Sequence, residues 1–158
     1  MSSKPRLLLA FLVAVLLASL LASVFQTQTN LAALQALGAP MPMEVRLGTI
    51  CLDLLGFAPT FALLSTLGFI FALPLAAWFV RRLPALRWAI FVLAGALAIW
   101  CALALANALA PMPTLIAADR TSLGTLGLMA CGSVGALLFG LLGTGCRLRS
   151  TSTSSDSQ

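Results

Sequence analysis

The chain has 158 residues, of which 61% are hydrophobic and only 8% are charged, and its formal net charge is +5. Soluble domains carry about 25% charged residues, so this composition excludes a water-soluble fold and predicts one membrane-embedded domain. The basic residues lie singly or in small groups beside apolar runs, which excludes the continuous basic stripe typical of nucleic-acid-binding proteins.

The first apolar run covers residues 7–25 and follows Lys4 and Arg6. It contains no charged residue and is long enough to cross a hydrocarbon core of about 30 Å. The alternative is a cleavable signal peptide, because small residues such as Ala18 and Ala22 offer cleavage-like sites. The run is longer than the apolar region of most signal peptides, so a retained first transmembrane helix is the prediction.

Residues 26–56 are predicted to form a structured outer loop. The pattern favours a short helix that ends at Gly38, because the prolines at positions 40 and 42 prevent its continuation. Residues 43–55 then place apolar side chains on one helical face and polar ones on another. This pattern is typical of an amphipathic helix that lies at a membrane interface.

Three further spans are predicted from the remaining apolar runs. They cover residues 57–80, with Pro59 in the first turn and a kink at Pro74, then residues 88–109, and finally the glycine-rich residues 124–145. The predicted fold is therefore all-α: a four-helix transmembrane bundle with an amphipathic outer-loop helix. Residues 1–146 form the single domain, and residues 147–158 are predicted to be a disordered cytoplasmic tail.

The basic residues predict the orientation of the bundle. Seven of the nine fall on one side of the four spans, and only Arg46 and Arg120 fall on the other. The seven are Lys4, Arg6, Arg81, Arg82, Arg87, Arg147 and Arg149. The positive-inside rule therefore places the N- and C-termini in the cytoplasm, and the alanine- and leucine-rich composition favours a bacterial inner (plasma) membrane.

Small residues in the third and fourth spans predict how these helices pack. Gly132, Ala136 and Gly140 form a ridge at four-residue spacing in the fourth span, and alanines recur every four residues from Ala94 to Ala106 in the third. Helices in a bilayer associate by close backbone approach at small residues, so the two rows are expected to face each other. The alternative is that the glycine ridge faces a second copy of the chain.

Polar side chains gather at the predicted outer ends of the helices. This set comprises Gln26, Gln28, Asn30, Glu44, Arg46, Asp53, Asn107, Asp119 and Arg120. Charged groups near hydrocarbon are costly unless they are paired, so an ion pair between Asp53 and Arg120 is one hypothesis. The set then forms either a ligand or partner site, or a wetted loop with a structural salt bridge.

The residue inventory argues against catalysis. Histidine and tyrosine are absent, and the cysteines at positions 51, 101, 131 and 146 are too far apart for a CxxC pair or a zinc site. No catalytic, cofactor-binding or metal-binding residue is predicted. The four-span plan with a long first outer loop is similar to that of the DsbB family of disulfide oxidoreductases. That family uses paired outer-loop cysteines, whereas this outer loop has only Cys51, so the resemblance concerns architecture alone.

The functional prediction is a small, non-catalytic accessory or assembly subunit that binds a partner through residues 26–56. Its expected partners are membrane lipids and either a membrane protein or further copies of the chain, with no nucleic acid and no cofactor. The alternative is a small oligomeric transporter or channel, whose cargo would need polar groups such as Ser65 and Ser133 at mid-membrane depth.

Overall fold

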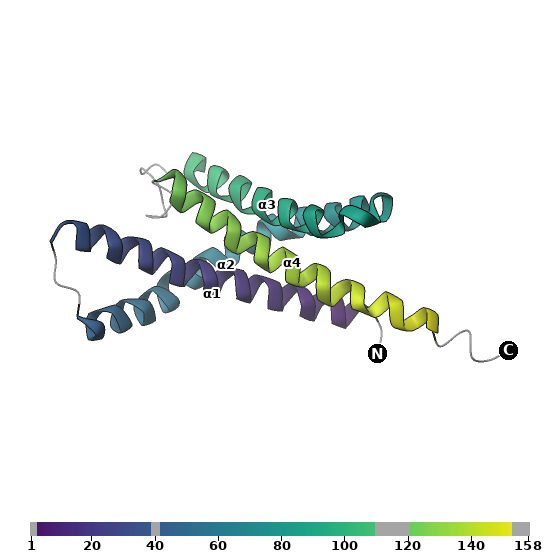
Figure 1. Cartoon of the computed structure of the whole chain (residues 1–158), viewed down its shortest axis with the longest axis horizontal. Coiled ribbons are helices and arrows are strands. Elements are labelled where there is room, and N and C mark those ends of the chain that lie inside the picture. Colours follow the sequence, from purple (N-terminus) through teal and green to yellow (C-terminus); the bar gives the residue numbers. More distant parts are fainter. Residues whose placement is uncertain (1–2, 39–41, 110–120, 153–158) are drawn as a thin grey trace.

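The computed structural model describes residues 3–38, 42–109 and 121–152, with side chains described from residue 5 to residue 143 within these ranges. The described chain is helical (Figure 1), and its elements are α1 (Ser3–Ala36), α2 (Met43–Arg82), the 3₁₀ turn η1 (Pro84–Leu86), α3 (Arg87–Leu109) and α4 (Ser122–Ser152). The four α-helices are each long and apolar enough to cross a membrane.

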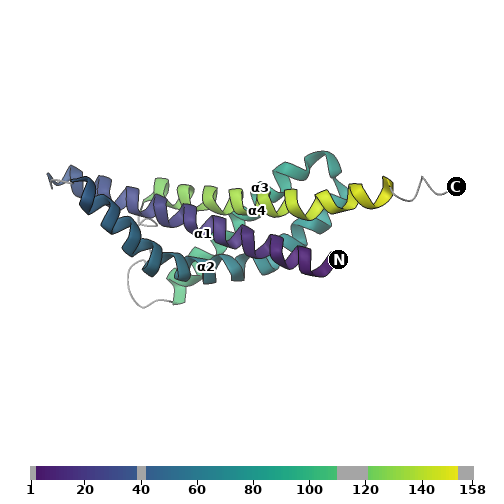
Figure 2. The same cartoon turned by 90° about the horizontal axis from the view of Figure 1, so that it is seen from below.

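The four helices form an antiparallel ring. Each helix packs along two neighbours, in the order α1, α2, α3, α4 and back to α1, while α1 and α3 occupy opposite corners. Figure 2 shows α1 between α2 and α4. The ring is therefore closed by the contact between the first and last helices of the chain.

The helices bury small, aromatic and some aliphatic side chains inside the ring, and most of the large apolar side chains exposed outside it are aliphatic. Phe61, Phe69, Phe91 and Ile99 are buried in the core, whereas outward-facing leucines such as Leu63 are largely exposed. A soluble bundle would carry polar residues on that outer face, so this apolar outer surface is of the kind that lipid solvates better than water.

The close contacts between α3 and α4 are made by glycines. A Cβ built on Gly95 would lie 2.5 Å from the carbonyl oxygen of Gly132 and 2.7 Å from the Cβ of Ala136, and one built on Gly140 would meet the ring of Phe91 at 2.6 Å. The ridge of Gly132, Ala136 and Gly140 thus lies against α3.

The alanine row of α3 is not its partner in this contact, contrary to the sequence-based expectation. The carbonyl oxygen of Ala98 lies 2.8 Å from a Cβ built on Gly68, so this part of the row faces α2. Phe91, Gly95 and Ile99, which also recur every four residues, supply the face toward α4. A helix at a ring corner needs two contact stripes, and the sequence offers no signal to say which stripe meets which neighbour.

The segment 26–56 is not a loop with a separate interfacial helix. Helix α1 continues to Ala36, and α2 begins at Met43 and runs without a break to Arg82, through both Pro59 and Pro74. Pro42, rather than Pro59, stands at the start of the helix. Continuation keeps most backbone hydrogen bonds of both helices, whereas each proline removes its own N–H donor and crowds the carbonyl group four residues earlier.

The turn between α1 and α2 begins where the sequence predicts. Gly38 adopts a φ of +81°, a conformation that side chains disfavour, and its N–H donates to the carbonyl oxygen of Gln35 at 3.0 Å. At the other end of the chain, α4 extends over residues 147–152, which form the first part of the predicted disordered tail. Residues 153–158 lie outside the described residues, so for them the tail stays a prediction. No proline or glycine follows Gly145 to stop the helix, and adding residues to a formed helix is far easier than starting one.

Candidate functional site at the α1–α2 hairpin

The end of the bundle farthest from the arginine-rich turn between α2 and α3 carries a projecting helical hairpin. We define the α1–α2 hairpin as residues 26–38 and 42–56, and Figure 1 shows it reaching beyond the ends of α3 and α4. At 1.5 Å per residue, α1 is about 51 Å long and α2 about 60 Å, while α3 is about 35 Å. The first two helices are therefore much longer than a hydrocarbon core of about 30 Å.

A polar seam joins the two helices at the base of this hairpin. The hydroxyl of Thr27, which is fully buried, donates to Asp53 Oδ2 at 2.7 Å and also lies 3.0 Å from the carbonyl oxygen of Ser23. A hydrogen bond to a carboxylate is stronger than one between neutral groups. Thr27 and Asp53 therefore fix the position of α2 against α1 at this level.

Two further polar side chains are buried beside Thr27. Ser23 is 0% exposed and Gln26 is 8% exposed, and neither Ser23 Oγ nor Gln26 Oε1 has a hydrogen-bond partner. Ser19, one turn earlier, is satisfied because its hydroxyl donates to the carbonyl oxygen of Val15 at 2.8 Å. Unsatisfied buried oxygens are costly, so Ser23 and Gln26 mark a place where the seam has unused hydrogen-bonding capacity.

A second side-chain pair lies nearer the tip of the hairpin. Arg46 Nη2 donates to Gln35 Oε1 at 3.4 Å, while Arg46 Nε is buried without a hydrogen-bond partner. The pair is exposed and long, so it contributes little energy. It does show that the polar faces of the two helices oppose each other up to the last turn of α1.

The structure places the predicted polar residues in different surroundings. Gln26 and Asp53 belong to the seam, Gln28 is exposed, and Asn30 is half-buried. Glu44 is exposed in the first turn of α2. Asn107 lies near the end of α3, at the opposite corner of the ring from α1.

The predicted ion pair between Asp53 and Arg120 falls partly outside the structure. Asp119 and Arg120 lie outside the described residues, so the pairing stays a prediction. The described partner of the Asp53 carboxylate is Thr27. Sequence reasoning missed Thr27 and Ser23, although Ser19, Ser23 and Thr27 recur at the four-residue spacing that places side chains on one helical face.

The outer surface of the hairpin is unusually apolar for a projecting element. Leu37 is 84% exposed, Leu55 79%, and Met43 and Leu52 71% each. Largely exposed apolar side chains on a projecting element mark a surface that is covered by something other than water. Leu52 and Leu55 lie on one side of α2, whereas Met43 lies on the opposite side from Leu52. We refer to the four residues together as the hairpin apolar face.

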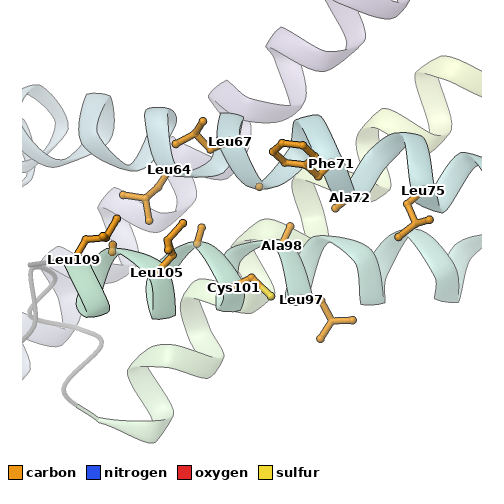
Figure 3. Close-up of a pocket in the computed structure, with 13 residues that line it drawn as sticks. Leu64, Leu67, Phe71, Ala72, Leu75, Leu97, Ala98, Cys101, Leu105 and Leu109 are labelled. Carbon is orange, nitrogen blue, oxygen red and sulfur yellow. The ribbon is translucent and has the colours of Figure 1, made fainter.

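A separate apolar groove runs between α2 and α3. Its volume is about 550 Å³, and Figure 3 shows Leu64, Phe71 and Leu75 of α2 opposite Ala98 and Cys101 of α3. Gly68, Ala98 and Ala102 are among its lining residues, and α2 and α3 approach each other closely at Gly68 and Ala98. No charged side chain lines the groove, so it is suited to hydrocarbon.

The residues whose side chains are described contain three cysteines and no cluster suited to a metal ion. Within the described ranges there is no group of three or more histidine, cysteine or acidic side chains that could hold a metal ion. Cys51 and Cys101 are exposed and Cys131 is buried, and all three are free thiols. No family model matches the sequence, and no similar curated protein or solved structure was found.

Proposed function

We propose that this chain is a non-catalytic accessory or assembly subunit of a bacterial inner (plasma) membrane, with both termini in the cytoplasm, that binds a membrane-protein partner through the α1–α2 hairpin. The observation that carries the proposal is the hairpin apolar face, which projects beyond α3 and α4. A face of this kind in contact with water would promote aggregation, so a bound partner accounts for it.

The arginine-rich turn supports this placement in the membrane. Arg81 and Arg82 end α2 and Arg87 begins α3, and guanidinium groups remain at the interface rather than in hydrocarbon. With that turn at one membrane face, the extra length of α1 and α2 emerges at the other. Residues 26–56 are then on the outer side, as the count of basic residues predicts.

The polar seam supports the proposal because it makes the hairpin rigid before binding. Thr27 and Asp53 connect α1 to α2, and neither helix is interrupted between the bundle and the tip. A preformed surface loses little conformational entropy on association, which favours affinity.

Site-specific photo-crosslinking in intact cells tests this function. A photoreactive residue at position 52 is expected to give one discrete adduct with a membrane protein. Leu55→Glu is expected to reduce the adduct by about tenfold or more, because it buries an unpaired charge in the interface. Gln28→Glu is the matched control, since it adds the same charge at an exposed polar position. Adducts with lipid alone, or an equal yield in Leu55→Glu, would contradict the proposal.

The unused polar capacity of the seam favours a second candidate, a small oligomeric transporter or channel. Ser23 and Gln26 are buried polar groups of the kind that line a solute path. Against it, Phe61 and Phe69 fill the interior of the ring with apolar volume. Solute flux through vesicles that contain the purified chain alone, lost on Ser23→Ala, would support the transporter over the accessory subunit.

A further inference from the structure

The α2–α3 turn holds three guanidinium groups beside two indole rings. Arg82 Cζ lies 5.5 Å from the centroid of the Trp78 ring, and Arg87 Cζ lies 4.6 Å from that of Trp88. These distances are in the range of cation–π contacts, which orient the guanidinium planes without neutralising them. Arg81 adds a third positive charge to the same turn.

The described residues supply no anion at this end of the bundle. Glu44 and Asp53, the carboxylates within the described ranges, lie near the opposite end of α2. Arg87 Nε is buried and has no hydrogen-bond partner. Arg87 also stands in the first turn of α3, where the helix dipole disfavours a cation, and no acidic residue accompanies it there. An external anion would relieve each of these costs.

We propose that the α2–η1–α3 turn binds the phosphate group of an anionic phospholipid. Tryptophan and arginine at the end of a span lie at headgroup depth, where a lipid phosphate is the abundant anion. Arginine can donate several N–H groups to one phosphate, and the N–H group at Arg87 Nε has no hydrogen-bond partner within the protein.

The α2–α3 groove extends this site toward the lipid tails. Two of its lining residues lie nearest the turn. Leu75 is about 10 Å from Arg82 along α2, and Leu97 is about 15 Å from Arg87 along α3. One leaflet of the hydrocarbon core is about 15 Å thick, so an acyl chain attached to a headgroup at the turn reaches the end of the groove nearest the turn. The groove lining is entirely uncharged, as an acyl chain requires.

Quenching of tryptophan fluorescence by brominated lipids tests the site. The chain has three tryptophans, so Trp100→Phe leaves Trp78 and Trp88 as reporters at the turn. The full-length chain is reconstituted in mixed vesicles of phosphatidylglycerol and phosphatidylcholine, with bromine on one lipid or the other. Brominated phosphatidylglycerol is expected to quench more strongly at equal mole fraction. Equal quenching by the two lipids would overturn the proposal.

Substitutions identify the groups responsible. Arg82→Gln with Arg87→Gln is expected to lower the preference for phosphatidylglycerol by about fivefold per arginine, whereas Arg82→Lys with Arg87→Lys is expected to keep only part of it, because lysine retains the charge but not the guanidinium N–H groups. Arg46→Gln, at the other end of α2, is expected to leave the preference unchanged. Circular dichroism verifies that each variant keeps its helix content. A preference that survives the double glutamine variant would overturn the assignment to this turn.

Inorganic phosphate separates the lipid from the free anion. At constant ionic strength, replacing chloride with phosphate is expected to leave most of the lipid preference in place, because the acyl chain adds to the binding of the headgroup. Loss of the preference in phosphate would show that the turn binds the free anion and would overturn the lipid assignment.

Discussion

Gly95 shows how closely α3 and α4 approach each other. The atoms that a Cβ at this position would meet are the carbonyl oxygen of Gly132 and the Cβ of Ala136. Neither atom can move aside by a side-chain rotation, so a larger residue must separate the helices. Close packing of this kind replaces the hydrophobic effect as the force that joins helices in lipid.

Gly95→Ala is therefore expected to lower the free energy of unfolding by about 1–3 kcal/mol relative to Gly143→Ala. A Cβ at Gly143 would meet only Leu7, at 3.9 Å. Both substitutions gain the helix propensity of alanine, so their difference isolates the packing cost. Titration of the purified protein with sodium dodecyl sulfate, followed by circular dichroism, measures it. Equal stabilities of the two variants would show that the α3–α4 contact is less close than the structure indicates.

At the scale of the element, the α1–α2 hairpin depends on two uninterrupted helices. If residues 43–55 were a separate interfacial helix, Asp53 would have no fixed position relative to Thr27. The hydrogen bond between them fixes the register of α2 on α1. This register allows a direct test by cross-linking.

In a chain whose native cysteines are replaced by serine, Thr27→Cys with Asp53→Cys is expected to cross-link rapidly with a short bifunctional thiol reagent. Thr27→Cys with Thr60→Cys serves as the control, because position 60 lies about 10 Å farther along α2. Mobility on denaturing gels reports the product. Similar rates for the two pairs would argue for a flexible hairpin and against the polar seam.

The sequence predicts the existence of the four helices well but their limits less well. Long apolar runs bounded by arginines define the spans, and Gly38 marks the end of α1. The extent of α1 and α2 was missed because Gln26, Gln28 and Pro59 resemble loop signals in a hydropathy profile, although a helix tolerates all three. The partner of Asp53 was missed because hydrogen bonding between helices depends on rotation about their axes, which a single sequence does not fix.

At the scale of the whole molecule, thiol labelling of the cysteines tests the proposed orientation of the chain in the membrane. Cys51 lies on the projecting part of α2 and is exposed, whereas Cys101 faces the α2–α3 groove and Cys131 is buried. A membrane-impermeant maleimide applied to intact spheroplasts is expected to label Cys51 alone, and Cys51→Ser is expected to abolish the signal. Labelling of Cys146 without permeabilisation, with Cys51 protected, would show the opposite orientation.

The contact between α1 and α4 has a consequence for biosynthesis. Gly135 of α4 packs against Ala14 and Ala18 of α1. Because α1 is synthesised first and α4 last, the face of α1 that carries Ala14 and Ala18 stays uncovered until α4 has been made. A nascent chain that has released only three helices leaves the small-residue face of α1 open to lipid or to an insertion chaperone. Premature termination before residue 121 would thus yield an open three-helix intermediate, a ready substrate for membrane proteases.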